Sequence, residues 1–172
     1  NITNVTITCT TVVRSAMLTG AQESPPVVTM ATGRGAVIVN PSTREITGGI
    51  TFAGLTATNF HIHQAPTGNP TANGPVIVGL VAAPGGGGAT VPAGTVLTEA
   101  QYTALLAGEL YFNVHTAANT GGEIRGQINV RGGVTAGLAS LNSAQEVPTN
   151  ASTATGRGTL VFDTATRAIL VA

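Results

Sequence analysis

The stretch Glu109-Leu-Tyr-Phe-Asn-Val-His115 alternates between two kinds of side chain. One set is apolar and consists of Leu110, Phe112 and Val114; the other consists of Tyr111, Asn113 and His115. Successive side chains of a β-strand point to opposite faces of a sheet, so this alternation predicts a strand with one face in the core. The stretch Thr58-Asn-Phe-His-Ile-His-Gln64 alternates in the same way and predicts a second strand.

The same period of two recurs along most of the chain, and turn-forming residues such as Asn40-Pro-Ser-Thr43 separate the runs. One helix is expected at 98–107, because Thr98 and Gln101 have the spacing of a capping box and Gly108 follows. Nine or more short strands with one short helix predict an all-β fold, an immunoglobulin-like or Greek-key β-sandwich or barrel. We expect its core to contain Val37, Val39, Ile50, Phe52, Phe60, Ile62, Val78, Leu80, Leu110, Phe112, Val114, Ile124 and Ile128.

The composition excludes several classes of protein. The 172 residues carry a formal net charge of zero, only 8% of them are charged, and all seven basic residues are Arg. A chain with so few cations does not suit binding to a nucleic-acid backbone, so we expect no nucleic-acid partner. No apolar run reaches the ~18 residues of a membrane-spanning helix. With 42% hydrophobic residues the chain is also too apolar to be disordered.

An internal repeat relates two parts of the chain. Residues 18–49 align without gaps with residues 141–172 at an offset of 123, and thirteen of the 32 positions are identical. The identical positions include Ala21-Gln-Glu23 and Ala31-Thr-Gly-Arg-Gly35, which recur as Ala144-Gln-Glu146 and Ala154-Thr-Gly-Arg-Gly158. Such a fragment holds too few strands for a core of its own.

These observations divide the chain into three parts. Residues 1–11 alternate and form an N-terminal strand extension, residues 12–135 form a complete β domain, and residues 138–172 form a partial second repeat. Cys9, the only cysteine, lies in the extension, so no disulfide can form within the chain.

The motifs of the complete domain resemble those of the CHRD family, first described in chordin and common in bacterial extracellular proteins. The resemblance rests on Leu18-Thr-Gly-Ala-Gln-Glu23, Ala31–Gly35, Phe60-His-Ile-His63, Tyr111–Thr116 and Gly122-Glu-Ile-Arg-Gly-Gln127, in that order. It covers roughly residues 12–130, with a truncated second copy after Leu138. It implies an immunoglobulin-like β-barrel related to copper–zinc superoxide dismutase, and it implies no catalytic activity.

The three histidines form the candidate metal site. His61 and His63 share the polar face of one predicted strand, and His115 lies on the polar face of another. If the two strands are neighbours, the three imidazoles can converge on one Cu(II) or Zn(II) ion. By the dismutase resemblance, His61 and His63 match a His-x-His copper pair and His115 a third ligand. A fourth histidine and the ligands of a zinc subsite are missing, so a complete dismutase site is excluded. The alternative is that the histidines only form hydrogen bonds.

Other polar residues are interpreted as structural. We expect Arg125 to form an ion pair across the strands with Glu109 or Glu123. Gly33-Arg-Gly35 is interpreted as a β-bulge at the start of a strand, because no helix follows it as in a phosphate-binding loop.

We expect an extracellular structural subunit that self-assembles, head to tail, into filaments by strand exchange. The alternatives are a copper- or zinc-binding, dismutase-like redox module and a monomeric extracellular adhesion or binding module. Enzymatic activity is not expected. The chain reads as a mature product secreted after removal of a signal peptide, and the sequons at Asn1, Asn4 and Asn150 permit N-glycosylation.

Overall fold

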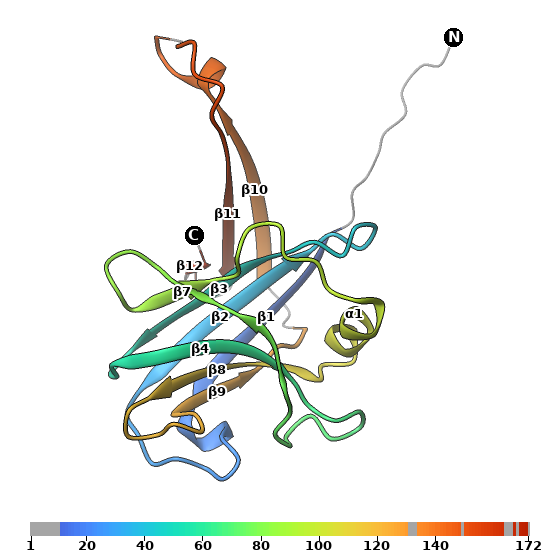
Figure 1. Cartoon of the computed structure of the whole chain (residues 1–172), viewed down its shortest axis with the longest axis vertical. Helices are drawn as coiled ribbons and strands as arrows, with labels where there is room; N and C mark the ends of the chain where they lie inside the picture. Colours follow the sequence, from blue (N-terminus) through green and yellow to red (C-terminus); the bar gives the residue numbers. More distant parts are fainter. Residues whose placement is uncertain (1–10, 131–133, 149, 164–166, 168, 172) are drawn as a thin grey trace.

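The structure, a computed structural model, describes residues 11–130, 134–148, 150–163, 167 and 169–171 (Figure 1). Residues 1–10, most of the expected N-terminal extension with Cys9, Asn1 and Asn4, lie outside the described residues. Nine strands form one sheet: β1 (Val12–Thr19), β2 (Thr32–Val39), β3 (Ile46–Ala53), β4 (Ala57–Gln64), β5 (Val76–Gly79), β6 (Val81–Ala82), β7 (Gly88–Thr90), β8 (Leu110–Thr116) and β9 (Ile124–Gln127). Three more strands form a second sheet: β10 (Val134–Asn142), β11 (Thr155–Asp163) and β12 (Ile169–Val171).

The nine-stranded sheet curls into a nearly closed barrel. Its strands follow the order β5-β4-β8-β9-β1-β2-β3-β7-β6, and neighbouring strands pair antiparallel. The two edge strands, β5 and β6, are consecutive in the chain and only Leu80 separates them. The Leu80 N–H donates to the Phe60 carbonyl at 3.0 Å, so the chain itself bridges the two edges. The predicted all-β fold is confirmed, with the barrel as its form.

The barrel interior holds most of the predicted core. Eleven of the thirteen expected residues are buried, and the two that are not fully buried are Phe52 and Phe60. These two rings stack with centroids 5.6 Å apart and line an apolar pocket of about 350 Å³ at one end of the barrel. They therefore cover the core at this end and do not lie inside it.

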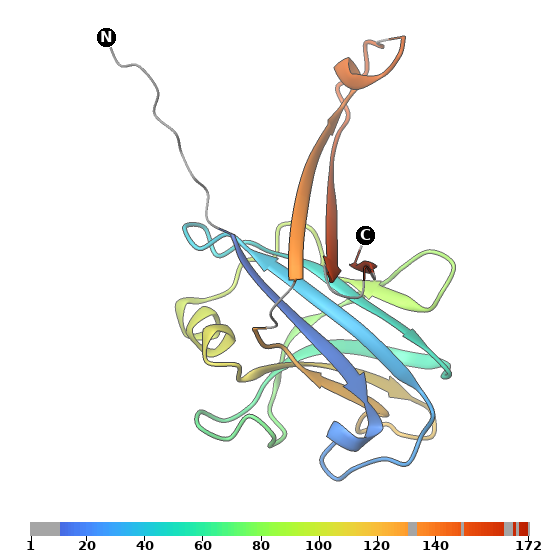
Figure 2. The ribbon, with the colours of Figure 1, turned by 180° about the vertical axis from the view of Figure 1, so that it is seen from behind.

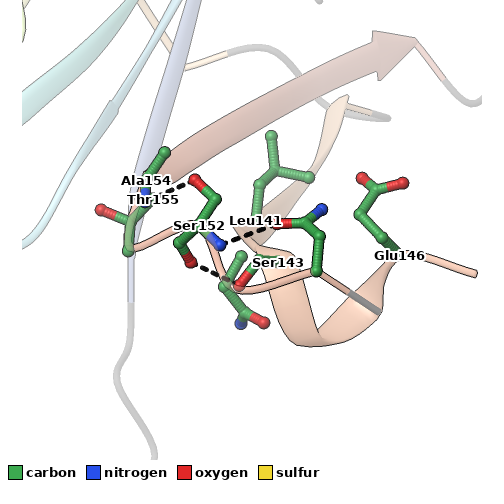
Figure 3. A pocket seen from close by; sticks show the side chains of 8 residues that line it. Leu141, Ser143, Glu146, Ser152, Ala154 and Thr155 are labelled. Carbon is green, nitrogen blue, oxygen red and sulfur yellow. Dashed lines mark hydrogen bonds between the residues drawn. The ribbon is translucent and has the colours of Figure 1, made fainter. Parts of the chain in front are cut away.

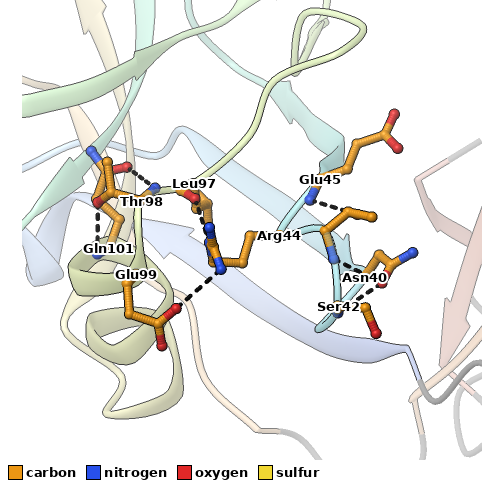
Figure 4. A network of polar contacts seen from close by, with 9 residues as sticks. Asn40, Ser42, Arg44, Glu45, Leu97, Thr98, Glu99 and Gln101 are labelled. Carbon is orange, nitrogen blue, oxygen red and sulfur yellow. Dashed lines mark hydrogen bonds and ion pairs between the residues drawn. The ribbon is translucent and has the colours of Figure 1, made fainter.

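Helix α1 (Glu99–Leu106) confirms the predicted helix and its capping box. Thr98 Oγ1 accepts from the Gln101 N–H at 3.2 Å, and the Gln101 side chain accepts from the Thr98 N–H at 2.9 Å. Arg44, in the β2–β3 turn, donates to the Leu97 carbonyl and forms an ion pair with Glu99 at 3.1 Å (Figure 4). Because this ion pair is largely exposed, its contribution to stability is small.

The second sheet repeats the beginning of the barrel. In the barrel, Thr19 pairs with Thr32 and Val12 with Val39; 123 residues later, Asn142 pairs with Thr155 and Thr135 with Phe162. The 3₁₀ turns Gly20–Gln22 and Ser143–Gln145 occupy equivalent places, and Arg44 and Arg167 both have positive φ, at 59° and 58°. The sequence repeat therefore corresponds to a repeat in backbone structure.

The β10–β11 hairpin projects away from the barrel, as Figures 1 and 2 show from opposite sides. Its contact with the barrel is made near the base of the hairpin. There Val161 is fully buried against Ala36 and Ile38 on the outer face of β2, and Val13 of β1 packs against the same cluster. The fragment is thus docked on the outside of the barrel by one of its two faces.

The Gly33-Arg-Gly35 motif is not a β-bulge, and that interpretation was wrong. It lies inside β2, which pairs in regular register with both β1 and β3. The glycines are needed because core side chains approach the strand closely. A Cβ at Gly35 would lie 2.6 Å from the Phe112 ring and 2.8 Å from Ile50. The motif therefore provides room for the aromatic core of the barrel.

We predict that Gly35→Ala destabilises the barrel by about 1–3 kcal/mol, because the added methyl group overpacks the core against the Phe112 ring. Gly158→Ala is the matched control, since Gly158 occupies the same repeat position in the β10–β12 sheet, outside the barrel. Urea unfolding of both variants measures the difference. Equal stability of the Gly35 and Gly158 variants would contradict this explanation of the motif.

Candidate metal centre

The pairing of β4 with β8 brings the three histidines together. The two strands are antiparallel neighbours in which Asn59 lies opposite His115, His61 opposite Asn113, and His63 opposite Tyr111. His61 and His63 point to the outer face of the barrel, while Ile62 between them is fully buried in the core. The expected convergence of His61, His63 and His115 is thus present in the structure.

The cluster is compact enough to hold one metal ion. The three potential ligand atoms all lie within 4.8 Å of one another, and His61 Nδ1 is 3.0 Å from His115 Nε2. Tetrahedral coordination with Zn–N bonds of 2.0–2.1 Å separates the ligand atoms by roughly 3.3 Å. Small side-chain rotations are therefore sufficient to bring the three nitrogens to one ion.

Backbone carbonyls orient two of the three rings. His63 Nδ1 is 2.9 Å from the Gly74 carbonyl, and His115 Nδ1 is 3.0 Å from the Thr120 carbonyl. A carbonyl can only accept, so both Nδ1 atoms carry the proton and both Nε2 atoms keep a lone pair. His61 Nδ1 must then donate to His115 Nε2. An entering metal would replace this shared proton, and the His61 proton would move to Nε2.

His63 is the most buried of the three histidines, with 9% of its surface exposed. Its Nε2 is buried and has no hydrogen-bond partner among the described residues. The pKa of His63 is lowered to about 4, mainly by desolvation and also by the nearby His61, His115 and Arg125, while the hydrogen bond to the Gly74 carbonyl opposes the shift. Desolvation and His115 also lower the pKa of His61. Both rings are held neutral, which is the form that binds metals.

The 65–75 loop covers part of this polar face. Tyr111 and Asn113, which the sequence places on the polar side of β8, are 1% and 2% exposed. The Tyr111 ring stacks on His63 with centroids 5.0 Å apart, and its hydroxyl accepts from the Gly74 N–H at 3.1 Å. The loop therefore both buries the face and supplies the carbonyl that orients His63.

Arg125 holds this loop in place. It is 1% exposed, and it donates to the carbonyls of Pro70 at 2.7 Å and Ala72 at 3.1 Å and to the Asn73 side chain at 3.1 Å. Its guanidinium also lies 3.4 Å from the centre of the Tyr111 ring, a cation–π contact. Arg125, Tyr111 and His63 thus form a stack that leads from a buried cation to the histidine cluster.

The expected ion pair of Arg125 with Glu109 or Glu123 is wrong. Glu109 accepts from the Gly68 N–H at 2.8 Å, and Glu123 accepts from Thr29 and Thr116, each at 2.8 Å. Backbone carbonyls of the 65–75 loop satisfy the guanidinium in place of a carboxylate.

Glu23 is a further buried ionisable group, and it contacts Asn113 of β8. It is 6% exposed, and its Oε2 accepts from Asn113 Nδ2 at 3.4 Å. Desolvation raises the pKa of Glu23 to about 7, although Arg125, Asn113 and a Ser24 hydrogen bond oppose this shift. In the described part of the chain, Glu23 Oε1 and Asn113 Oδ1 are buried without a hydrogen-bond partner. Protonation would turn the Glu23 carboxyl into a donor as well as an acceptor.

Sequence reasoning treated Glu23 and Arg125 only as structural residues and gave Tyr111 and Gly74 no role at the site. The sequence does contain a signal for three of these residues, because Glu23, Tyr111 and Arg125 all lie in the segments that resemble CHRD motifs. Gly74 lies in a Pro/Gly/Asn-rich loop that has no periodic pattern.

The fold and site together define an all-β barrel module with a three-histidine cluster on its outer face. Residues 14–128 match the model of the CHRD domain family, more than half of the chain, and the chain belongs to that family. CHRD domains occur in extracellular and secreted proteins. No curated protein and no solved structure was found to match the chain.

Two further expectations concern the membrane and glycosylation. In the described part of the chain, the helical segments fall short of the length and hydropathy that a membrane-spanning helix requires. Asn150 is exposed, and its side chain accepts from the Ser152 N–H at 2.9 Å. Glycosylation of this asparagine stays a prediction.

The shifted pKa values of His63 and Glu23 predict opposing pH dependences in the metal-free protein. His63 titrates near 4 when folded and near 6.5 when unfolded, so its contribution to stability is lost as pH falls from 6.5 to 4. Glu23 titrates near 7 when folded and near 4.5 when unfolded, so its contribution is lost as pH rises through this range. Between about 4.5 and 6.5 the two effects offset each other.

Glu23→Gln removes the carboxyl titration and keeps a hydrogen-bonding amide. We predict that the unfolding free energy of this variant rises with pH more steeply than that of the wild type between 4.5 and 6.5, by up to about 1.4 kcal/mol per pH unit. Urea unfolding with a chelator present, over a series of pH values, measures both slopes. A variant slope equal to or below the wild-type slope would refute the assignment.

Proposed function

We propose that this chain is an extracellular CHRD module that binds one copper or zinc ion through His61, His63 and His115. The observation that carries the proposal is the set of three imidazole nitrogens within 4.8 Å of one another, together with a buried His63 Nε2 that has no hydrogen-bond partner among the described residues. Imidazole nitrogens suit both Cu(II) and Zn(II). The Gly74 and Thr120 carbonyls orient His63 and His115 as outer hydrogen-bond partners do in metal sites.

The proposal is limited to metal binding, with no redox turnover. All three histidines of the chain belong to this one cluster, so no further histidine can bridge to a second metal as in copper–zinc dismutases. Copper and zinc differ in the geometry that they prefer, and three imidazole ligands suit either. The metal would act as a binding or structural centre on the barrel face.

We predict that the full chain binds about one Cu(II) or Zn(II) per molecule at neutral pH, where imidazole is mostly neutral. The double variant His61→Ala/His63→Ala should lose this binding. Asn59→Ala, an exposed residue on the same strand, is the matched control and should bind as the wild type does. Isothermal titration with each metal measures affinity and stoichiometry, and electron paramagnetic resonance reports the nitrogen ligands of Cu(II). Absence of binding to the wild type, or undiminished binding to the double variant, would refute the proposal.

A second candidate function is self-assembly, and a specific observation favours it. Three large apolar side chains of the β10–β12 sheet are exposed to solvent. The exposed fraction is 53% for Leu141, 41% for Leu160 and 63% for Ile169. Such side chains favour association with another chain. An open sheet edge can also accept a strand, so residues 1–11 of one subunit could extend the β10–β12 sheet of the next and build a filament.

Under this second candidate, we predict filaments or concentration-dependent oligomers of the full chain in electron microscopy and sedimentation. Deletion of residues 1–11 should shorten or abolish the filaments, because it removes the donated strand and leaves the described barrel complete. A full chain that sediments as a monomer at high concentration would contradict self-assembly. Filaments that survive the deletion would contradict the donor role of residues 1–11.

A further inference from the structure

The loop of residues 20–30, which joins β1 to β2, is held on the barrel in an unusual way. Between residues 21 and 30 a single residue is buried, and it is the acid Glu23. Its exposed fraction is 6%, whereas those of Val28 and Met30 on the same loop are 105% and 95%. Apolar side chains therefore contribute little to holding this loop, and polar contacts must do so.

Two polar contacts beside Glu23 fasten the loop to neighbouring segments. The Asn73 side chain donates to the Ser24 carbonyl at 2.6 Å, and Thr29 Oγ1 donates to Glu123 Oε1 at 2.8 Å. The donors and acceptors of both contacts lie in residues that are exposed or partly buried. Water can compete for such hydrogen bonds, so the buried carboxyl of Glu23 is the contact best placed to hold the loop.

The carboxyl group of Glu23 faces the amide of Asn113 on β8. Glu23 Oε2 accepts from Asn113 Nδ2 at 3.4 Å. The remaining oxygens, Glu23 Oε1 and Asn113 Oδ1, are buried with no hydrogen-bond partner among the described residues. A Cβ at Gly122 would collide with each of them, so these two oxygens are neighbours. Exchanging the nitrogen and oxygen of the amide would leave the same mismatch, because an ionised carboxylate can only accept.

One proton removes this mismatch. If Oε1 is protonated, Glu23 can donate to Asn113 Oδ1 while its Oε2 still accepts from Nδ2. The two side chains then form a closed pair with two hydrogen bonds, and both buried oxygens are satisfied. An ionised Glu23 would leave two buried acceptors side by side without a donor, which is unfavourable. The geometry therefore fits the protonated acid.

The nearby cation does not replace this proton. Burial raises the pKa of Glu23 to about 7, and Arg125 of β9 opposes the rise only in part. The Arg125 guanidinium donates to the Pro70 and Ala72 carbonyls, and within the described chain it forms no ion pair with Glu23. The acid is therefore paired with a neutral amide and not with the cation.

The other titratable groups around Glu23 are few. They are Glu123, which precedes β9, and Tyr111 and His115 of β8. In the described part of the chain, none of these three forms a hydrogen bond or ion pair with Glu23 or shifts its pKa. The 65–75 loop contains no titratable residue. The protonation of Glu23 thus depends mainly on its burial and its amide partner.

The internal repeat provides a comparison. Ala21-Gln-Glu23 recurs as Ala144-Gln-Glu146, and in both copies the acid directly follows a 3₁₀ turn. Glu146 is exposed, and Figure 3 shows it beside an open pocket of about 280 Å³, without a hydrogen bond to the other residues drawn. The same motif therefore buries its acid only where Asn113 is present to pair with it.

We propose that Glu23 is a pH-dependent anchor of the 20–30 loop: the protonated carboxyl pairs with the Asn113 amide and holds the loop on β8, and ionisation releases it. The closed loop keeps the pKa of Glu23 at about 7, whereas an open loop exposes a carboxyl with its ordinary value of 4.5. The anchor is therefore fully effective below pH 4.5 and is lost as pH rises to about 7. This inference does not depend on metal binding.

Hydrogen exchange of the full chain, with a chelator present, tests the anchor between pH 4.5 and 6.5. The reporter is the Val27 N–H, which donates to the Gly20 carbonyl at 2.9 Å within the closed loop. After correction for intrinsic exchange, its opening constant should rise about tenfold per pH unit, up to ~100-fold over this range. The Ile128 N–H, which donates to the Leu110 carbonyl in the barrel, is the control for global unfolding and should not share this rise.

Two variants and one direct measurement isolate the carboxyl group. Glu23→Gln cannot ionise, so its Val27 opening constant should stay constant between pH 4.5 and 6.5. Glu146→Gln makes the same change at the exposed position of the repeat and should behave as the wild type does. Carbon-13 NMR of the Glu23 carboxyl in the wild type reports its protonation without any substitution, and it should show the protonated acid at about pH 5.5.

Each outcome decides the proposal. A steep rise at Val27 in the wild type and in Glu146→Gln, with none in Glu23→Gln, would support the anchor. A wild-type opening constant that stays level or falls as pH rises would overturn it, because an ionised Glu23 would then hold the loop equally well. A rise that persists in Glu23→Gln, an equal rise at Ile128, or an ionised Glu23 carboxyl at about pH 5.5 would overturn it too.

Discussion

The antiparallel pairing of β4 with β8 is the constraint on which the candidate metal centre depends. A sheet in this register places residues 61, 63 and 115 on one face. The residues that alternate with them along each strand then point into the core. A shift by one residue would turn every histidine inward and every core residue outward. The burial of Ile62, Phe112 and Val114 therefore fixes the position of the imidazoles as well as the fold.

The buried guanidinium of Arg125 fixes the 65–75 loop, which contacts Tyr111 and His63. Arg125 binds the backbone of the 65–75 loop, and the loop returns through Gly74 to Tyr111 and His63. This guanidinium is satisfied mainly by carbonyl groups and an aromatic ring, so its removal would take the donor from the Pro70 and Ala72 carbonyls and leave the loop without this anchor. Motif residues of the CHRD family thus support the orientation of the proposed ligands.

Much of the barrel could be predicted because period-two patterns report directly on which face of a strand is buried. The helix was predictable from its capping box, and the histidine face from the spacing of His61 and His63. The covering of Tyr111 was not predictable, since the 65–75 loop that contacts it has no periodic signal. Arg125 was assigned a carboxylate partner because sequence cannot show backbone carbonyls. The Gly33–Gly35 motif was misread because only the packed structure shows the Phe112 ring beside it.

The central claim is that the three rings share one ion, and the tautomers of the histidines test it most directly. Nitrogen-15 NMR of the imidazoles should show His63 and His115 protonated at Nδ1 with and without zinc, since carbonyls hold both protons. His61 should be protonated at Nδ1 without zinc and at Nε2 with one equivalent of zinc, because the metal takes the place of its shared proton. A His61 tautomer that zinc leaves unchanged, or a His63 protonated at Nε2, would contradict the account.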